Sequence, residues 1–307
     1  MILTICLSPC IDVNVEVDSL NVGMSHKIIS KRIFFTGKAL NVAIGIARLK
    51  SSVFATGFMY EINGGQFEQE LHREGVPYKF VWNKGRVREN YKFIDRKSML
   101  TEVDDISPEV NAEKQAELIE LIKKLSADCE AVVISGGLTK GMTPDYYGKI
   151  LSAVPVGVKK IVDTEGERLI SALNCGVDLA KPNVDELERT LNRKLKNKSD
   201  MIAGCNEIIS KGAKRVLLSL GKNGAIITDG STNLYCKSVN VAMNSTLGAG
   251  DGMVAAASDA LVKGGSLEDI LKCGVAAGTA AVTLPDTISF NKNKYDEILS
   301  TLTVKEI

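Results

Sequence analysis

The sequence predicts an α/β fold, a doubly wound and mostly parallel sheet with helices on both faces, plus a small β-sheet lid. From about residue 110, short buried strands alternate with helices, which is typical of a parallel sheet covered on both faces. The first hundred residues instead contain two segments in which polar and apolar residues alternate. With 307 residues, 45% of them hydrophobic, the chain is long enough for one large core. We therefore expect one domain over residues 1–307.

The first hundred residues supply the predicted lid. Residues 1–7 are apolar and suit a short buried strand, and residues 12–18 and 90–96 alternate as half-exposed strands do. Helical segments at 40–49 and 66–74 separate them. We place the lid strands at about 12–36 and 87–104. An exposed sheet of this kind serves as a lid, a dimer interface or both, so we expect a homodimer through the lid.

The remainder of the chain supplies the doubly wound core. Apolar residues at helical spacing alternate with short runs of buried strand residues. The last two helices are rich in alanine and glycine, which suits close helix packing. The predicted elements are helix 113–125, strand 131–134, helix 145–153, strand 160–163, a strand end at 178–181, strand 216–219, and helices 251–262 and 270–282.

Composition excludes several classes of protein. The 38 Lys and Arg residues against 37 Asp and Glu leave a charge of +1, which gives no electrostatic case for nucleic acid or an anionic membrane. No apolar run approaches the roughly 20 residues that span a bilayer. Only His26 and His72 are available for a Ser-His-Asp triad or a zinc site. The seven cysteines are scattered without C-x-x-C spacing, so we expect reduced thiols in a cytoplasmic protein.

The strongest chemical signal is the segment 245–252, which runs directly into a predicted helix. Gly248 and Gly250 let several amides point one way, and the positive end of the helix dipole adds to this anion site. Asp251 is either the N-cap of that helix or a carboxylate placed to take a proton from an attacking hydroxyl. Spacing alone slightly favours the cap. The segment is not a G-x-G-x-x-G fingerprint, and the chain has no Walker A loop.

Three further segments are candidates for binding a ligand. Residues 36–41 precede a helix and bring a glycine, a lysine and an asparagine together, although an ordinary helix start explains them as well. Asn183 and Glu186 follow a strand end and are suited either to a hydrated Mg²⁺ or to capping the next helix. Residues 219–224 follow another strand and fit a nucleotide loop or a plain β-turn.

In this order the segments resemble the ribokinase-like (PfkB) carbohydrate kinases, over nearly the whole chain. The resemblance is to the branch of 1-phosphofructokinases and tagatose-6-phosphate kinases. The matching segments are Ser8–Asp12 (N-P-A-x-D), Thr36–Ala43 (G-G-K-G-x-N-V), Val87–Asn90 (T-R-x-N), Ser135–Leu138 (S-G-S-L/I), Val162–Gly166 (D-T/A-S-G), Asn183–Glu186 (N-x-x-E), Ser219–Gly224 (S-x-G-x-x-G) and Gly248–Asp251 (G-A-G-D).

The resemblance implies an ATP- and Mg²⁺-dependent kinase and a role for each matching residue. Asp251 is the implied general base, and the anion hole is formed by the amides of Gly248, Ala249 and Gly250. ATP is implied at Lys181, Ser219, Gly221, Gly224, Gly248 and Gly250, and magnesium, through its waters, at Asn183 and Glu186. The sugar phosphate is implied at Asp12, Gly37, Asn41 and Ser135, with Lys38, Arg88 and Asn90 on the phosphate it already carries.

Three departures from the branch pattern matter for the sugar. Thr36 and Ala39 replace glycines of the G-G-K-G loop, and Gly252 stands where the branch has serine. We expect fructose 1-phosphate as the substrate, then tagatose 6-phosphate, and third a free sugar or a nucleoside. A rival hypothesis is a non-catalytic sugar-phosphate sensor on the same fold. Asp251, Asn183 and Glu186 favour catalysis, because a protein that only binds needs no base.

Overall fold

The computed structural model describes residues 1–97, 99–242, 248–284 and 289–307. Across these residues ten strands form one sheet in the order β14-β13-β12-β11-β10-β9-β8-β1-β4-β5. Neighbours from β5 to β11 pair in parallel, and β12, β13 and β14 add an antiparallel edge. The strands are β1 (Ile2–Cys6), β4 (Val53–Ile62), β5 (Tyr78–Arg86), β8 (Ala131–Ser135), β9 (Lys159–Asp163), β10 (Leu179–Ala180), β11 (Val216–Ser219), β12 (Ala225–Thr228), β13 (Asn233–Cys236) and β14 (Val304–Glu306).

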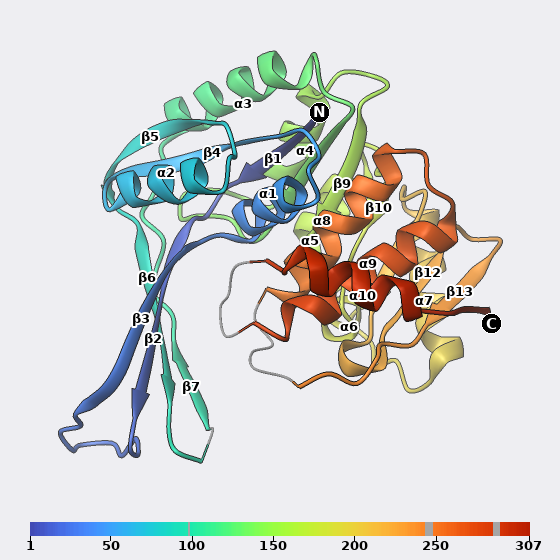
Figure 1. The fold of residues 1–307 in the computed structure, drawn as a ribbon. Helices are drawn as coiled ribbons and strands as arrows, with labels where there is room; N and C mark the ends of the chain where they lie inside the picture. The colour runs from blue at the N-terminus through green and yellow to red at the C-terminus, as the bar shows by residue number, and fades with distance from the viewer. Residues whose placement is uncertain (98, 243–247, 285–288) are drawn as a thin grey trace.

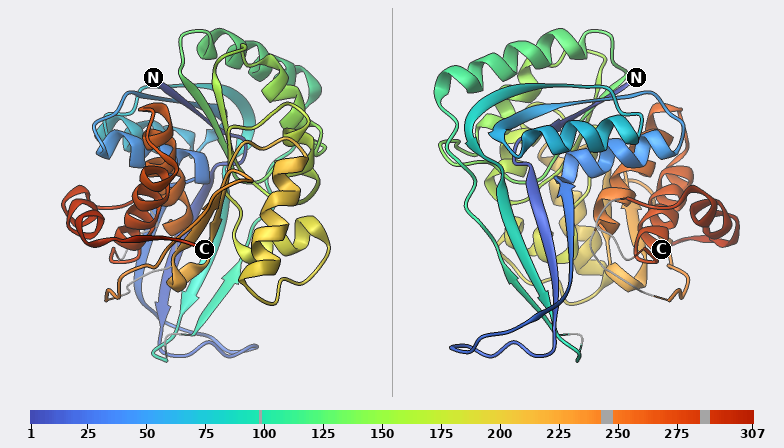
Figure 2. Two further views of the ribbon diagram at one scale, coloured as in Figure 1. Left: turned by 90° about the vertical axis from the view of Figure 1, so that its right-hand side faces the viewer. Right: turned by 60° about the vertical axis from the view of Figure 1, so that its left-hand side comes forward.

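Helices cover both faces of this sheet (Figures 1 and 2). One layer contains α1 (Lys38–Arg48), α2 (Gly64–Arg73), α8 (Ala249–Val262), α9 (Leu267–Ala281) and α10 (Lys292–Thr301). The other contains α3 (Ala112–Ser126), α4 (Tyr146–Ala153), α5 (Gly166–Leu173), α6 (Val184–Leu191) and α7 (Lys198–Ser210). The predicted doubly wound, mostly parallel α/β fold is therefore confirmed. Its helices at 113–125, 145–153 and 251–262 lie within two residues of the observed bounds.

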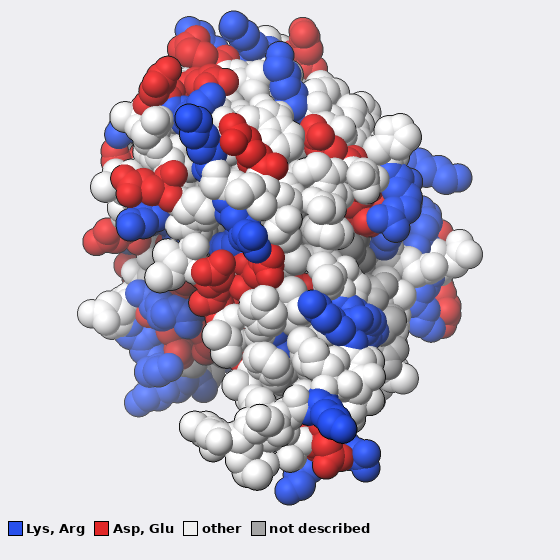
Figure 3. All heavy atoms as spheres, turned by 90° about the vertical axis from the view of Figure 1, so that its left-hand side faces the viewer, with Lys and Arg blue, Asp and Glu red and all other residues white. Residues whose placement is uncertain are grey.

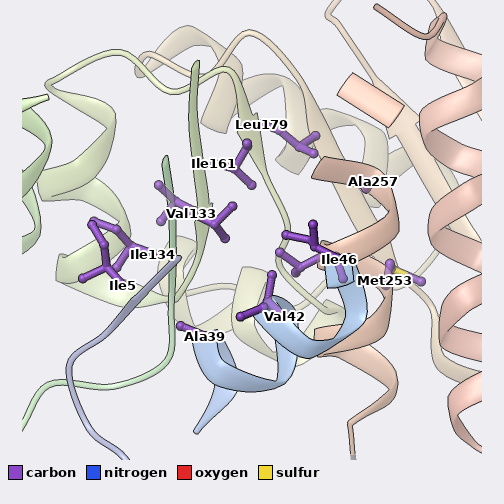
Figure 4. Close-up of a cluster of buried hydrophobic side chains, with 14 of the residues drawn as sticks. Ile5, Ala39, Val42, Ile46, Val133, Ile134, Ile161, Leu179, Met253 and Ala257 are labelled. Carbon is purple, nitrogen blue, oxygen red and sulfur yellow. The ribbon is translucent and has the colours of Figure 1, made fainter. Parts of the chain in front are cut away.

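Buried side chains fill both sides of the sheet, and Figure 4 shows the part of this core that lies between the sheet and helices α1 and α8. Strand residues such as Val133 and Ile161 meet Val42 of α1 and Ala257 of α8, and all four are fully buried. Because helices cover both faces of the parallel sheet, every side chain of a central strand is buried, and the predicted strands are therefore continuous apolar runs. The small residues of α8 allow it to pack closely on α9, as the composition of these two helices predicts.

A second sheet, which we call the lid, projects from one end of the body (Figures 1 and 2). It has four strands in the order β3-β2-β6-β7, and β2 pairs in parallel with β6. Its strands are β2 (Cys10–Val17), β3 (Ile28–Thr36), β6 (Arg88–Ile94) and β7 (Leu100–Val103). One face of β2 carries Asp12 and Asn14, and the opposite face carries alternating valines. These valines are buried within the chain itself, each at 3% exposure or less.

The order of the large sheet reverses between β1 and β8. From β1 the chain moves outward to β4 and β5, and it then returns to build β8, β9, β10 and β11 on the other side. In open α/β sheets ligands bind outside the carboxyl ends of strands near such a reversal. Ser135, Asp163 and Ser219 are the last residues of β8, β9 and β11, so their side chains stand at that edge.

Candidate active site

Asp251 lies inside the first turn of α8 and does not cap it. The N-cap is Gly248, which adopts a left-handed φ of 76° and makes no side-chain capping bond. A side chain is strained in that conformation, so glycine is needed there. The interpretation of Asp251 as an N-cap is thus wrong, because the cap position falls three residues earlier. Residues 245–247, the start of this motif, lie outside the described residues.

The Asp251 carboxylate is buried at 7% exposure and accepts a hydrogen bond from Asn41 Nδ2 of α1 at 2.8 Å. Burial raises its pKa to about 6, a change that the cations Lys38 and Lys181 partly oppose and that Asp163 reinforces. Such a group is ionised at neutral pH yet basic enough to accept a proton, which is the balance that a general base requires.

Asp163 is the hub of the charged groups around this carboxylate. Its side chain accepts a hydrogen bond from Ser135 Oγ at 2.7 Å and lies 3.0 Å from Lys181 Nζ and 3.8 Å from Lys38 Nζ. Burial would raise the pKa of Asp163, but the two lysines outweigh it and hold that pKa below its ordinary value. Asp163 in turn raises the pKa of Lys38. The ammonium of Lys38 is therefore held in its charged form, and Lys181 lies in contact with the same carboxylate, where a phosphoryl group would need positive charge.

Asn183 and Glu186 form a capping box at the start of α6. Glu186 N donates to Asn183 Oδ1 and Asn183 N donates to Glu186 Oε2, each at 2.8 Å. The capping alternative for Asn183 is therefore confirmed. The second carboxylate oxygen, Glu186 Oε1, lies 3.6 Å from Lys38 Nζ. This oxygen and the nearby Asp163 carboxylate are hard donors, which fits a magnesium ion that keeps most of its waters.

The nucleotide loop predicted at 219–224 lies beside this capping box. β11 ends at Ser219, a short 3₁₀ turn η1 (Gly221–Asn223) follows, and Gly224 leads into β12. Ser219 N donates to Pro182 O at 3.0 Å, and Ser219 pairs with Asn183 in an isolated parallel bridge. Lys181 Nζ stands 3.5 Å from the position that a Cβ on Gly250 would occupy. The loop, the capping box and the start of α8 thus meet at one edge of the sheet.

Most of the predicted sugar-binding residues lie in the lid or at the start of α1, and Ser135 lies apart from them at the end of β8. Gly37 must be glycine, because a Cβ there would lie 2.7 Å from Cys6 Sγ. Asp12 forms a buried ion pair with Lys92 at 2.9 Å. Arg88 donates to Asn90 Oδ1 at 3.2 Å at the base of the lid. Lys38, by contrast, lies with Asp163 and Glu186, so the structure groups the two predicted phosphate ligands with different partners.

Two charged residues of this region were missed by the sequence reasoning. Asp163 stood in the quoted motif 162–166, and its place at a strand end could have marked it as a ligand-facing carboxylate. Lys92 follows Asn90 by two residues, so alternation along the strand places both on one face. A lysine in an alternating strand is normally expected to face solvent, yet Lys92 is only 6% exposed.

The departures at Thr36, Ala39 and Gly252 are accommodated by the structure. Thr36 ends β3 and Ala39 lies in α1, and neither has a positive φ, so neither position requires glycine. At position 252 the advantage of glycine is its size. A Cβ at this position would lie 3.2 Å from both Ala277 O and Phe290 Cδ1, so the absence of a side chain lets α8 approach its neighbours closely.

Comparison with known proteins agrees with this geometry. The model of the pfkB family of carbohydrate kinases matches residues 2–294. The chain belongs to that family. It is 29% identical to a 1-phosphofructokinase of Borreliella burgdorferi over 308 residues, covering 100% of this chain and 99% of the relative. It is 28% identical to a tagatose-6-phosphate kinase of Staphylococcus epidermidis over 311 residues, with both chains fully covered.

A solved structure is similar over almost the same length. The tetrameric inhibited form of phosphofructokinase-2 from Escherichia coli superposes with a TM-score of 0.89 at 30% identity, covering 97% of this chain and 98% of that one. The pfkB chain described here is therefore a phosphotransferase that acts on an alcohol group of a sugar phosphate. The alternative of a non-catalytic sensor is set aside.

Two further observations concern the charge of the surface and the character of the helices. Figure 3 shows lysine and arginine interspersed with aspartate and glutamate over one face of the molecule. None of the helices in the described part of the chain combines the length and the apolar character that crossing a bilayer requires.

Proposed function

We propose that this pfkB kinase transfers the γ-phosphoryl group of ATP to fructose 1-phosphate and forms fructose 1,6-bisphosphate. The observation that carries the proposal is the buried Asp251 carboxylate, held by Asn41 beside two lysines. Tagatose 6-phosphate is the second candidate, because relatives of either activity are about equally similar to this chain. The body and the lid act together as one kinase domain in this proposal.

In the proposed reaction Asp251 removes the proton from the free sugar hydroxyl. The hydroxyl oxygen then forms a bond to the γ-phosphorus of ATP, and the bond from that phosphorus to the β,γ-bridging oxygen breaks. The amides of Gly248, Ala249 and Gly250 and the ammonium of Lys181 would balance charge on the transferred group. Gly221 and Gly224, with Ser219, would hold the rest of the nucleotide.

Glu186 Oε1 and Asn183 would hold magnesium through water molecules. Magnesium supplies charge neutralisation for the nucleotide phosphates when it is bound. Within this chain the contribution of the pair is orientation, because the capping box fixes both side chains relative to α6. The Asp163 carboxylate, at the end of the adjacent strand β9, keeps Lys38 and Lys181 in place.

We propose that Arg88 holds the phosphate that the substrate already carries, with Asn90 beside it. The Nε atom of Arg88 is buried and has no hydrogen-bond partner among the described residues, which favours a ligand at this position. Lys38 has a 46% exposed side chain and can reach a phosphate by leaving its two carboxylates. Asp12, Gly37, Asn41 and Ser135 would line the sugar between these phosphate sites.

We further propose a homodimer through the lid. Val13 of β2 pairs with Ile33 of β3 on one side and with Tyr91 of β6 on the other, and Tyr91 pairs in turn with Val103 of β7. Paired residues point to the same face of a sheet, so these four share one face. Ile33 is 48% exposed and Val103 is 55% exposed. The chain itself buries the valines of β2 on this face, so the surface that a second lid would cover is the exposed apolar residues of β3 and β7 at its two edges. Oligomers occur in the family, since the similar Escherichia coli enzyme is named as a tetramer.

The decisive experiment is ATP turnover with purified protein against a panel of acceptors. The panel contains fructose 1-phosphate, tagatose 6-phosphate, fructose 6-phosphate, free fructose and a nucleoside. We expect the highest kcat/KM with fructose 1-phosphate. A higher value with another sugar phosphate replaces the acceptor and leaves the kinase assignment intact. The seven free cysteines suit the reducing cytoplasm in which we expect the enzyme to act.

A further inference from the structure

In the lid, Asp12 is surrounded by the buried side chains of Lys92, Thr36 and Cys10, which have no role in the proposed reaction. Lys92 Nζ donates to Asp12 Oδ2 at 2.9 Å, and Thr36 Oγ1 lies 3.4 Å from the same oxygen. Cys10 Sγ lies 3.2 Å from Thr36 Oγ1 and 3.8 Å from Asp12 Oδ1. All four residues are at most 7% exposed, so their contacts are made away from bulk water.

Two of these residues are departures that lie against each other. Thr36 stands at a glycine position of the family pattern and Cys10 at an alanine position. Glycine and alanine at these places would leave open space beside Asp12. In this chain that space contains a hydroxyl, a methyl group and a thiol, and the Sγ to Oγ1 distance of 3.2 Å joins the two side chains directly.

The two oxygens of the Asp12 carboxylate differ in the donors that contact them. Oδ2 faces the Lys92 ammonium at 2.9 Å and the Thr36 hydroxyl at 3.4 Å, so a substrate hydroxyl would have to compete with both groups for this oxygen. Thr36 has a single proton and can also donate it to Cys10 O at 3.3 Å, but it fills the space whichever acceptor takes the proton. Among the residues that the structure describes, the donor facing Oδ1 is the weak thiol of Cys10 at 3.8 Å, which leaves this oxygen able to accept a stronger hydrogen bond.

We propose that Thr36, Cys10 and Lys92 leave Asp12 a single oxygen for the sugar and thereby select ketose phosphates whose C3 and C4 hydroxyls are trans over their cis epimers. Cis hydroxyls lie on one side of the furanose ring and can donate to both oxygens of one carboxylate. Trans hydroxyls diverge, so only one of them reaches the carboxylate. Closing Oδ2 removes the advantage of the cis sugar and leaves the trans sugar unaffected. This inference rests on the proposed function, within which it favours the fructose over the tagatose configuration.

The test compares two sugars that differ only at C4. We measure kcat/KM for fructose 1-phosphate and tagatose 1-phosphate with the wild type and with the double variant Thr36→Gly/Cys10→Ala. Opening Oδ2 restores a charge-assisted hydrogen bond to the cis epimer. The double variant should therefore shift the ratio of the two values toward tagatose 1-phosphate by roughly ten- to a hundred-fold. The value for fructose 1-phosphate should change by less than about threefold.

Two controls separate this effect from a loosened loop. Thr36→Val keeps the volume of the side chain beside Oδ2, so it should retain the wild-type preference. Ala39→Gly changes the other departure in the same loop, away from Asp12, and should leave the ratio unchanged. An unchanged ratio in the double variant overturns the inference, as does a wild type that itself prefers the cis epimer.

The inference can fail separately from the proposed function. If the wild type phosphorylates only 6-phosphates, the same ratio is read with fructose 6-phosphate and tagatose 6-phosphate, which are also C4 epimers. If it phosphorylates none of these sugars, the proposed function fails. The preference is then measured by calorimetry as the ratio of the dissociation constants for the two epimers. A shift of this ratio toward the cis epimer in the double variant Thr36→Gly/Cys10→Ala supports the inference, and an unchanged ratio overturns it.

Discussion

The acid limb of the pH–rate profile should report the ionisation of Asp251. Burial moves the pKa of this carboxyl from an ordinary 3.8 to about 6, which corresponds to about 3 kcal/mol against the charged form. A group with a raised pKa is protonated as the pH falls through that value, and a protonated carboxyl cannot act as a base. At pH 5 only about a tenth of the carboxylate is ionised, so kcat/KM should be roughly tenfold below its plateau at neutral pH.

The hydrogen bond from Asn41 provides a second perturbation with a defined sign. This bond stabilises the charged form of Asp251 at 2.8 Å, and a hydrogen bond to a charged group is worth about 1.5–3 kcal/mol. Asn41→Leu should therefore raise the midpoint of the acid limb by about one to two pH units. Asp251→Asn should lower kcat by roughly 10²–10⁴-fold and change KM far less, because the amides at the start of α8 remain.

The assay is coupled ATP turnover between pH 4.5 and pH 8.5 in buffers of constant ionic strength. Asp259→Asn is the matched control, because Asp259 is also a buried carboxylate of α8, at 8% exposure, and is paired with Lys263. It should leave the profile unchanged. An Asp251→Asn enzyme within about threefold of the wild type, or an acid limb near the ordinary pKa, would refute the assignment of Asp251 as the base.

Three other predictions test the remaining parts of the site. Glu186→Gln should raise the Mg²⁺ concentration that gives the half-maximal rate. It keeps the capping box, since glutamine also accepts the hydrogen bond from Asn183 N. The control Asp185→Asn, on the same helix, should leave the Mg²⁺ concentration unchanged. An unchanged titration contradicts the magnesium role. Arg88→Ala should lower kcat/KM by roughly ten- to a hundred-fold with fructose 1-phosphate and much less with free fructose. Equal losses with both sugars would argue for a structural role. Ile33→Asp should shift the protein toward monomer in sedimentation, and a monomeric wild type would rule out the lid dimer.

The sequence by itself determined the fold class and located the segments that form the candidate site. Burial along a strand or helix repeats with a local period, so residues 131–134 and 216–219 could be recognised as core strands without any knowledge of their neighbours. Motifs such as 248–251 and 183–186 are likewise local, because a glycine turn or a capping box is formed within a few residues. These features follow from short-range geometry, and the structure confirms the elements that contain them.

Only the tertiary structure decided which residues meet. Asp251 and Asn41 are 210 positions apart, and Asp12 and Lys92 are 80 apart. Asp163 meets Ser135 and Lys181 because parallel pairing brings the ends of β8, β9 and β10 to one edge. Strand order depends on how the whole chain packs, and local periodicity does not encode it. For the same reason the choice between a cap and a base at Asp251 could not be made from spacing. It depends on whether another segment buries the carboxylate and supplies a donor to it.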